Sequence, residues 1–112
     1  MTTDDAGFDL LADRTLTSLV AALDREDGVE AELSMGVLTI SFDAGGAAFV
    51  VNSHRAAGQI WLAADRAAWH FDPVDGGARW VATKPPREEL HAALSAALSR
   101  RLGRAVELRT TG

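Results

Sequence analysis

The chain has 112 residues, a formal net charge of -5, a sequence pI near 5.0 and no cysteine. This charge disfavours nucleic acid and anionic membranes as main partners and favours a cation or a basic protein surface. The lack of cysteine excludes disulfides, thiolate metal sites and cysteine nucleophiles.

With 47% hydrophobic and 24% charged residues, the composition is typical of a globular chain. The length suits a single domain covering residues 1–112. The first residues lack the basic and apolar regions of a signal peptide, so we expect a cytoplasmic protein without a membrane span.

The first predicted element is an amphipathic helix. Apolar residues from Phe8 to Leu23 recur at spacings of three and four. Asp4 or Asp5 is a suitable N-cap, and Gly28 ends the helical pattern. Several aspartates lie along one edge of the apolar stripe and give the helix an acidic edge: Asp9, Asp13, Asp24 and Asp27.

About six short strands are predicted after this helix, because apolar and polar residues alternate with a period of two. Short turns separate them, so the sheet should be an antiparallel meander. Asp65 to Ala68 are expected to form a four-residue connection, and Pro73 is expected to end its strand or to lie at a bulge. The predicted strands cover residues 29–34, 37–43, 47–53, 59–64, 69–74 and 78–83.

A second amphipathic helix is predicted to begin at Pro85-Pro86 and to end at Gly103, with Glu88 and Glu89 near its positive end. Residues 106–108 are apolar enough to pack back on the fold. Two helices and a sheet, each with one apolar face, predict an α+β fold. It is a two-layer α-β sandwich with both helices on one sheet face and the other face open.

Trp61 is predicted to lie on the open face, because Ile60 and Leu62 alternate with it toward the core. Burying an aromatic side chain removes about 150–250 Å² from water, so an exposed one needs a reason. Either a loop or the chain end covers Trp61, or the alternation slips at a bulge and buries it, or Trp61 anchors a protein interface together with its polar neighbours. Trp69, Phe71 and Trp80 are assigned to the core or to sheet packing.

The order helix, strands, helix and several short sequence words resemble the frataxin family in its short bacterial form, from roughly Phe8 to Arg109. The most specific word is Gln59-Ile60-Trp61-Leu62, preceded by Val51-Asn52 and followed by Trp69-His70-Phe71-Asp72. Leu11-Ala12-Asp13 and Gly36-Val37-Leu38-Thr39-Ile40 also match. The fold implied by the resemblance is the same two-layer sandwich.

The resemblance implies an adaptor of iron–sulfur cluster assembly that binds ferrous or ferric iron weakly through surface carboxylates. It also implies binding to a cysteine desulfurase, whose sulfur production it modulates, and to the cluster scaffold protein, with a monomer in the absence of metal. Carried over by position, the iron-binding carboxylates are Asp5, Asp9, Asp13, Asp24, Asp27, Glu30 and Glu32. The partner-binding residues are Asn52, Gln59, Trp61 and His70. Arg14, Thr17, Ala21 and Arg25 stand where relatives commonly carry acids.

Several alternatives stay open at this point. Carboxylates without cysteine or clustered histidine suit weak, exchangeable binding of a hard cation, but they also suit a solvated edge with no metal role. His54, His70 and His91 lie on separate elements, which does not favour zinc, and His91 is expected at the protein surface.

No enzymatic motif is present, so we predict no enzyme and treat weak oxidation of ferrous iron as a further hypothesis. The rival from another class is an acidic chaperone, of the secretion type or a general protein-binding type. It predicts a stable homodimer and an exposed apolar helix groove.

Overall fold

The computed structural model describes residues 5–108. In this part of the chain two helices, α1 (Asp5–Leu23) and α2 (Leu90–Leu102), flank a single antiparallel sheet. The strands are β1 (Val29–Ser34), β2 (Val37–Phe42), β3 (Phe49–His54), β4 (Gln59–Ala64), β5 (Ala67–Val74) and β6 (Arg79–Ala82).

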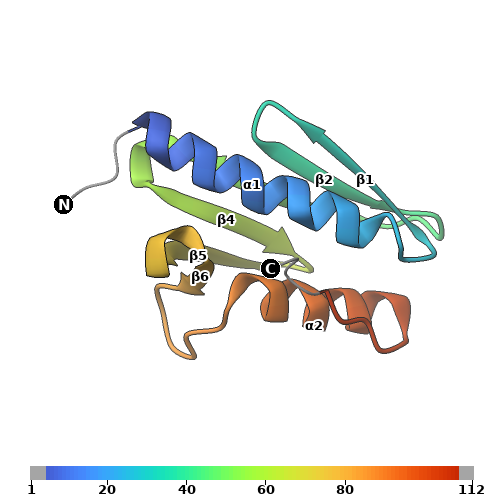
Figure 1. The fold of residues 1–112 in the computed structure, drawn as a ribbon. Helices are drawn as coiled ribbons and strands as arrows, with labels where there is room; N and C mark the ends of the chain where they lie inside the picture. The colour runs from blue at the N-terminus through green and yellow to red at the C-terminus, as the bar shows by residue number, and fades with distance from the viewer. Residues whose placement is uncertain (1–4, 109–112) are drawn as a thin grey trace.

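The sheet order is β1-β2-β3-β4-β5-β6, so each strand pairs with its neighbour in sequence. Both helices lie on one side of the sheet, which leaves the opposite face open (Figure 1). The predicted α+β sandwich with a six-stranded meander is therefore confirmed. Two short 3-10 turns, η1 (Arg55–Ala57) and η2 (Asp75–Gly77), connect β3 to β4 and β5 to β6.

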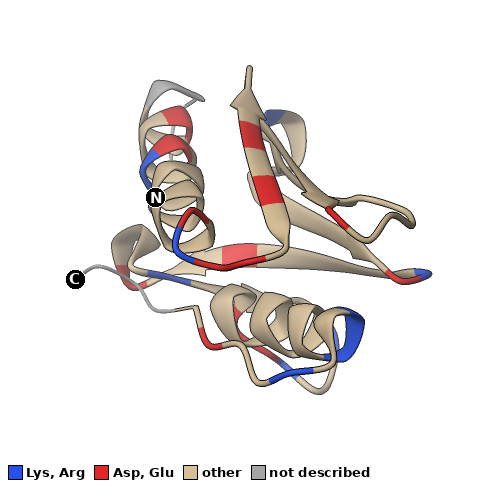
Figure 2. Cartoon of the chain, turned by 90° about the vertical axis from the view of Figure 1, so that its right-hand side faces the viewer, with Lys and Arg blue, Asp and Glu red and all other residues tan. Residues whose placement is uncertain are grey.

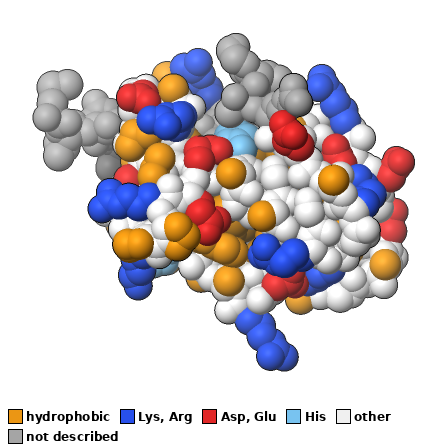
Figure 3. Space-filling view, turned by 90° about the horizontal axis from the view of Figure 1, so that it is seen from below, with side chains coloured by type: hydrophobic (Ala, Val, Ile, Leu, Met, Phe, Trp, Pro, Cys, Tyr) orange, Lys and Arg blue, Asp and Glu red, His pale blue; other side chains and the backbone are white. Residues whose placement is uncertain are grey.

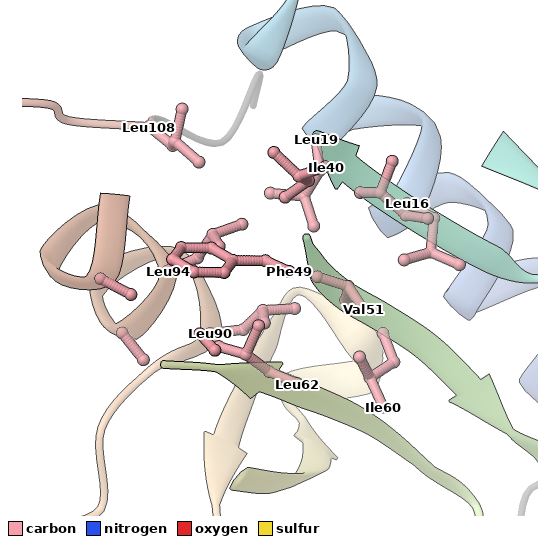
Figure 4. Packing of buried hydrophobic residues seen from close by; sticks show 14 of the residues in the cluster. Leu16, Leu19, Ile40, Phe49, Val51, Ile60, Leu62, Leu90, Leu94 and Leu108 are labelled. Atoms are coloured by element: carbon pink, nitrogen blue, oxygen red, sulfur yellow. The ribbon is translucent and has the colours of Figure 1, made fainter. Parts of the chain in front are cut away.

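The core forms between the helices and the inner sheet face. Leu16 and Leu19 of α1 and Leu90 and Leu94 of α2 point toward apolar side chains of the central strands (Figure 4). As predicted, Phe71 and Trp80 are buried and Trp69 packs against this core. Residues 106–108 also pack back as predicted, because Val106 and Leu108 are buried.

The start of α2 differs from the prediction. Pro85-Pro86 does not begin the helix, which starts at Leu90. The backbone N–H of Ala82 donates to the carbonyl of Glu88 at 2.8 Å, and Glu89 forms a β-bridge with Val81. The chain therefore bends at residues 83–86 and returns to pair with β6 at Glu88 and Glu89 before α2 begins. The predicted end is confirmed, because Gly103 caps α2 in the left-handed conformation.

The β4–β5 connection is shorter than predicted. Ala64 pairs directly with Ala67, so the turn consists of Asp65 and Arg66, with φ values of 47° and 72°. Two central residues with positive φ are typical of a type I′ hairpin, whose twist matches that of the flanking strands. The predicted four-residue connection is wrong because Ala67 and Ala68 belong to β5.

Pro73 neither ends β5 nor lies at a bulge, since it pairs with Trp80 of β6. On the other side, the pairing of β5 with β4 reaches only Phe71 and Ile60. Because the edge of Pro73 facing β4 has no strand partner, its missing N–H interrupts no ladder on that side.

Charge is distributed unevenly over the molecule. Figure 2 shows acidic residues on α1 and along the β1–β2 hairpin, and basic residues at the end of α2, where Arg100 and Arg101 lie in the last turn. On the face seen from below, both signs are interspersed with small hydrophobic areas (Figure 3). Over the described residues, neither helix has the length and apolarity needed to cross a membrane.

Candidate functional site

The most ordered feature of the open sheet face is a column of three stacked rings. The Trp61 indole lies between the imidazoles of His54 and His70, with ring centroids 4.0 and 4.2 Å apart and interplanar angles of 15° and 12°. Trp61 is directly opposite Asn52 on β3 and His70 on β5. Three adjacent strands therefore hold the column.

Hydrogen bonds fix the orientation of this column. The Trp61 Nε1–H donates to Gln59 Oε1 at 2.9 Å, and Gln59 Nε2 donates to Asp72 Oδ1 at 3.0 Å. His54 Nδ1 accepts from the backbone N–H of Ala57 at 3.3 Å, so the neutral ring carries its proton on Nε2. The side chains are thus pre-organised on rigid strands, which lowers the entropy cost of binding a partner.

Cover by a loop or burial at a bulge does not describe the surroundings of Trp61, and its role in an interface stays a prediction. Its side chain is half-buried, and the covering groups are the two imidazoles rather than a loop or a bulge. The strand alternation places it on the open face as predicted. A partner can therefore reach the edges of the stacked rings, but it cannot receive the indole as an inserted side chain.

The four residues predicted to bind a partner, Asn52, Gln59, Trp61 and His70, lie together on the open face. Their role in binding stays a prediction. His54 is part of the same cluster, although the sequence did not assign it there. Its place could have been predicted from its spacing, because His54 follows Asn52 by two residues within β3 and alternate residues of a strand share a face.

Asp9, one of the predicted iron ligands, is engaged by a base. Arg55 donates to both of its carboxylate oxygens, through Nε at 3.1 Å and through Nη2. This bidentate pair joins α1 to η1. The carboxylate of Asp9 is therefore already compensated by a guanidinium.

Three other predicted ligands lie near one another beyond the opposite end of α1. Asp24, Glu30 and Glu32 line a shallow hollow of about 400 Å³ together with Ser41. All three acids are exposed. Their proximity gives this end of the molecule a negative surface that suits a cation or basic side chains.

The remaining predicted ligands are dispersed. Asp13 is exposed on α1, and Asp27 is exposed in the loop after it, where its backbone carbonyl accepts from Arg104 Nη2 at 2.6 Å. The side chain of Asp5 lies outside the described residues. Among the described side chains, no group of three or more histidines, aspartates and glutamates is arranged to hold a metal ion. The exposed carboxylate oxygens suit weak, exchangeable binding of a hard cation and do not form a closed metal site.

His91 is buried, with 6% of its surface exposed, so the prediction of a solvated surface residue is wrong. It points toward Glu89, and His91 Nδ1 lies 2.8 Å from Glu89 Oε2. Glu89 also caps α2 by accepting from the backbone N–H groups of His91 and Ala92. These bonds hold the Glu89 carboxylate at the start of α2, where the His91 side chain contacts its second oxygen.

The same contacts set the charge state of Glu89. Partial burial raises the pKa of its carboxyl. This effect is outweighed by hydrogen bonds from the side chain and backbone of His91, by the charge of His91 and by the N–H of Ala92, so the pKa lies below its usual value. Glu89 is therefore ionised at neutral pH. Its pairing with His91 is a structural contact at the start of α2.

A larger groove of about 830 Å³ runs beside α1, with η2 and His91 among its walls. Its lining combines Leu11 and Ala78 with the charged residues Asp13 and Arg14. The chaperone alternative predicts an apolar helix groove; the exposed lining of this groove is more apolar than polar, with Asp13 and Arg14 also contributing to it, so the groove does not decide against that alternative.

Comparison with known proteins agrees with this architecture. A family model described as a frataxin-like domain matches residues 1–104. Among solved structures, the chain is similar to frataxin from Psychromonas ingrahamii, with a TM-score of 0.84 and 22% sequence identity. The match covers 95% of this chain and 98% of that chain. At this identity the structural match supports the fold, and the family assignment comes from the family model.

Proposed function

The chain belongs to the frataxin family, and from that premise we propose that it is an iron-binding adaptor that regulates a cysteine desulfurase in iron–sulfur cluster assembly. At the level of the family, the role is one of iron–sulfur assembly or iron handling. We further propose that the whole chain is one frataxin-like domain. It acts in the cytoplasm, as a monomer without metal and without enzymatic activity of its own.

The observation that carries the proposal is the cluster on the open sheet face. Asn52, Trp61 and His70 stand opposite one another on three strands, and Gln59 is tied to the indole by a hydrogen bond. An aromatic group set among polar side chains, on rigid strands and not covered by the helices, is typical of a protein-binding surface. We propose that this surface contacts the desulfurase and the scaffold protein.

The hollow lined by Asp24, Glu30 and Glu32 supplies the second part of the proposal. Asp24, Glu30 and Glu32 gather beside one hollow, in a chain whose net charge is -5. Such a surface steers a basic partner toward the protein and raises the association rate at low salt. Exposed carboxylates also bind ferrous or ferric iron weakly, so iron is proposed to occupy this hollow as an exchangeable ion.

The proposal is tested by titrating the purified protein against its cognate cysteine desulfurase. We expect binding that weakens in Asp24→Lys and that falls with rising salt. A light-scattering mass for the metal-free protein should be that of a monomer. A stable homodimer that does not bind the desulfurase would favour the chaperone alternative instead.

A further inference from the structure

The tip of the β1–β2 hairpin exposes a large apolar side chain. Met35 has 98% of its surface exposed, and it stands in the two-residue turn between Ser34 and Val37. Its φ is 51°, in the left-handed region that a long side chain rarely adopts, and Gly36 follows with a φ of 78°. Glycine, asparagine or aspartate is usual in such a turn.

The tip is held in place rather than left free. The backbone N–H of Ser53 donates to the carbonyl of Gly36 at 2.9 Å, and Ser53 Oγ donates to the same carbonyl at 3.3 Å. A Cβ on Gly36 would lie 2.5 Å from Ser53 Oγ, so the backbone of the turn packs directly against β3. Met35 therefore projects from a fixed support.

This tip continues the row of residues on the open face. Val37 is directly opposite Asn52, which is directly opposite Trp61, which faces His70. Val37 is itself 39% exposed. The hairpin stands up beyond α1 at this edge of the sheet (Figure 1). The row from Val37 to His70 thus crosses four strands on the open face, and the turn that carries Met35 lies at the Val37 end of this row.

We propose that Met35 is the apolar anchor of the partner surface and that it inserts into an apolar pocket bordered by basic side chains on the partner protein. This inference rests on the proposed function, because it assigns a role within the same interface. Both faces of Trp61 are covered by imidazoles, so Trp61 offers only its edge, whereas the Met35 side chain is free to enter a pocket. A flexible thioether adapts to the shape of such a pocket.

The charge around the tip defines the partner pocket further. Glu32 lies on β1 of the same hairpin, three residues before Met35, and it is exposed, whereas Glu30 lies at the other end of β1. A carboxylate near an apolar anchor fits a pocket with lysine or arginine at its rim, because opposite charges there favour encounter and fix the register. The surface that receives Met35 is therefore proposed to be a basic surface of the cognate desulfurase.

The test compares Met35→Asn with wild-type protein in titrations against the desulfurase. Asparagine tolerates positive φ, so this variant keeps the turn while it removes the apolar side chain. We expect its affinity to fall by about tenfold or more, in the range of interface hot spots. Leu10→Ala is the matched control, because Leu10 is a 61% exposed apolar residue on α1, and its affinity should not change.

The outcomes separate this inference from the proposed function. If Met35→Asn binds like wild type while Trp61→Ala binds more weakly, Met35 is not an anchor and the sheet face still binds the desulfurase. If both variants bind like wild type, the proposed function fails as well. If wild type is a dimer and Met35→Asn a monomer, the tip binds a second copy of the chain, which also overturns the inference.

Discussion

The indole of Trp61 and the imidazole of His70 stack across β4 and β5, with their ring centroids 4.2 Å apart and their planes 12° from parallel. The two residues are direct cross-strand partners, so the register of the hairpin produces the stack. This register depends on the two-residue turn at Asp65 and Arg66. A short turn far from the indole thus positions the group proposed to meet the partner.

The stack is expected to contribute measurably to stability. In a double-mutant cycle of Trp61→Ala and His70→Ala, the coupling between the two side chains should be about 0.5–1.5 kcal/mol in the free energy of unfolding. A second cycle, which pairs Trp61→Ala with Arg100→Ala, is the control. Arg100 lies on α2 in the helix layer, so its effect should add to that of Trp61→Ala within about 0.5 kcal/mol. Equal coupling in the two cycles would show that the stack adds nothing specific.

Iron binding should depend on the hollow beside β1 more than on Asp9. The Asp9 carboxylate is held by Arg55, whereas Glu30 and Glu32 are exposed beside Asp24. In anaerobic titrations with ferrous iron, the double variant Glu30→Gln/Glu32→Gln should bind about tenfold more weakly, or about 1.4 kcal/mol. Asp9→Asn is the matched control and should stay within about twofold of wild type. A greater loss in Asp9→Asn would place the iron at the other end of α1.

The cap of α2 predicts a specific dependence of stability on pH. Because folding holds the pKa of Glu89 below its usual value, the unfolded chain takes up a proton at this group at higher pH than the folded chain does. The stabilisation is therefore present above the unfolded pKa of about 4.5 and is lost as pH falls through the folded pKa. At neutral pH, Glu89→Gln keeps an oxygen that accepts from the N–H groups of His91 and Ala92 but removes the negative charge, so it should cost about 0.3–1 kcal/mol.

This expectation is checked by chemical denaturation near pH 7 and near pH 3. The difference between wild type and Glu89→Gln should be smaller at the lower pH, because the stabilisation from the charge of Glu89 declines below the unfolded pKa of about 4.5. Glu88→Gln is a neighbouring control that leaves the cap intact and should have the smaller effect at neutral pH. A difference that stays the same at both pH values would show that the charge of Glu89 does not stabilise the fold.

Much of the fold and part of the site could be predicted from local sequence patterns. Alternation within β4 is enough to place Trp61 on one face of the strand and the buried Ile60 and Leu62 on the other, independently of the neighbouring strands. Gln59 shares this strand face for the same reason. Asn52 and His70 join them because consecutive short strands form a meander, in which neighbours in sequence are neighbours in space.

The features that were missed depend on contacts between distant segments. The stacking of His54 on Trp61 requires the β3–β4 register, which no single strand specifies. The late start of α2 follows from pairing of Glu88 with Ala82, and this competes with the helix-starting tendency of the two prolines. The burial of His91 depends on how α2 packs, so helical periodicity alone placed it at the surface.

The affinity of Trp61→Ala for the cognate cysteine desulfurase shows whether the open sheet face is the docking surface. The variant should first be shown to be folded by circular dichroism and then titrated beside wild type and Leu10→Ala. We expect an affinity at least tenfold lower for Trp61→Ala, as for a hot-spot residue, and wild-type affinity for Leu10→Ala. A folded Trp61→Ala protein that binds the desulfurase as tightly as wild type would contradict the claim that the open sheet face is the docking surface.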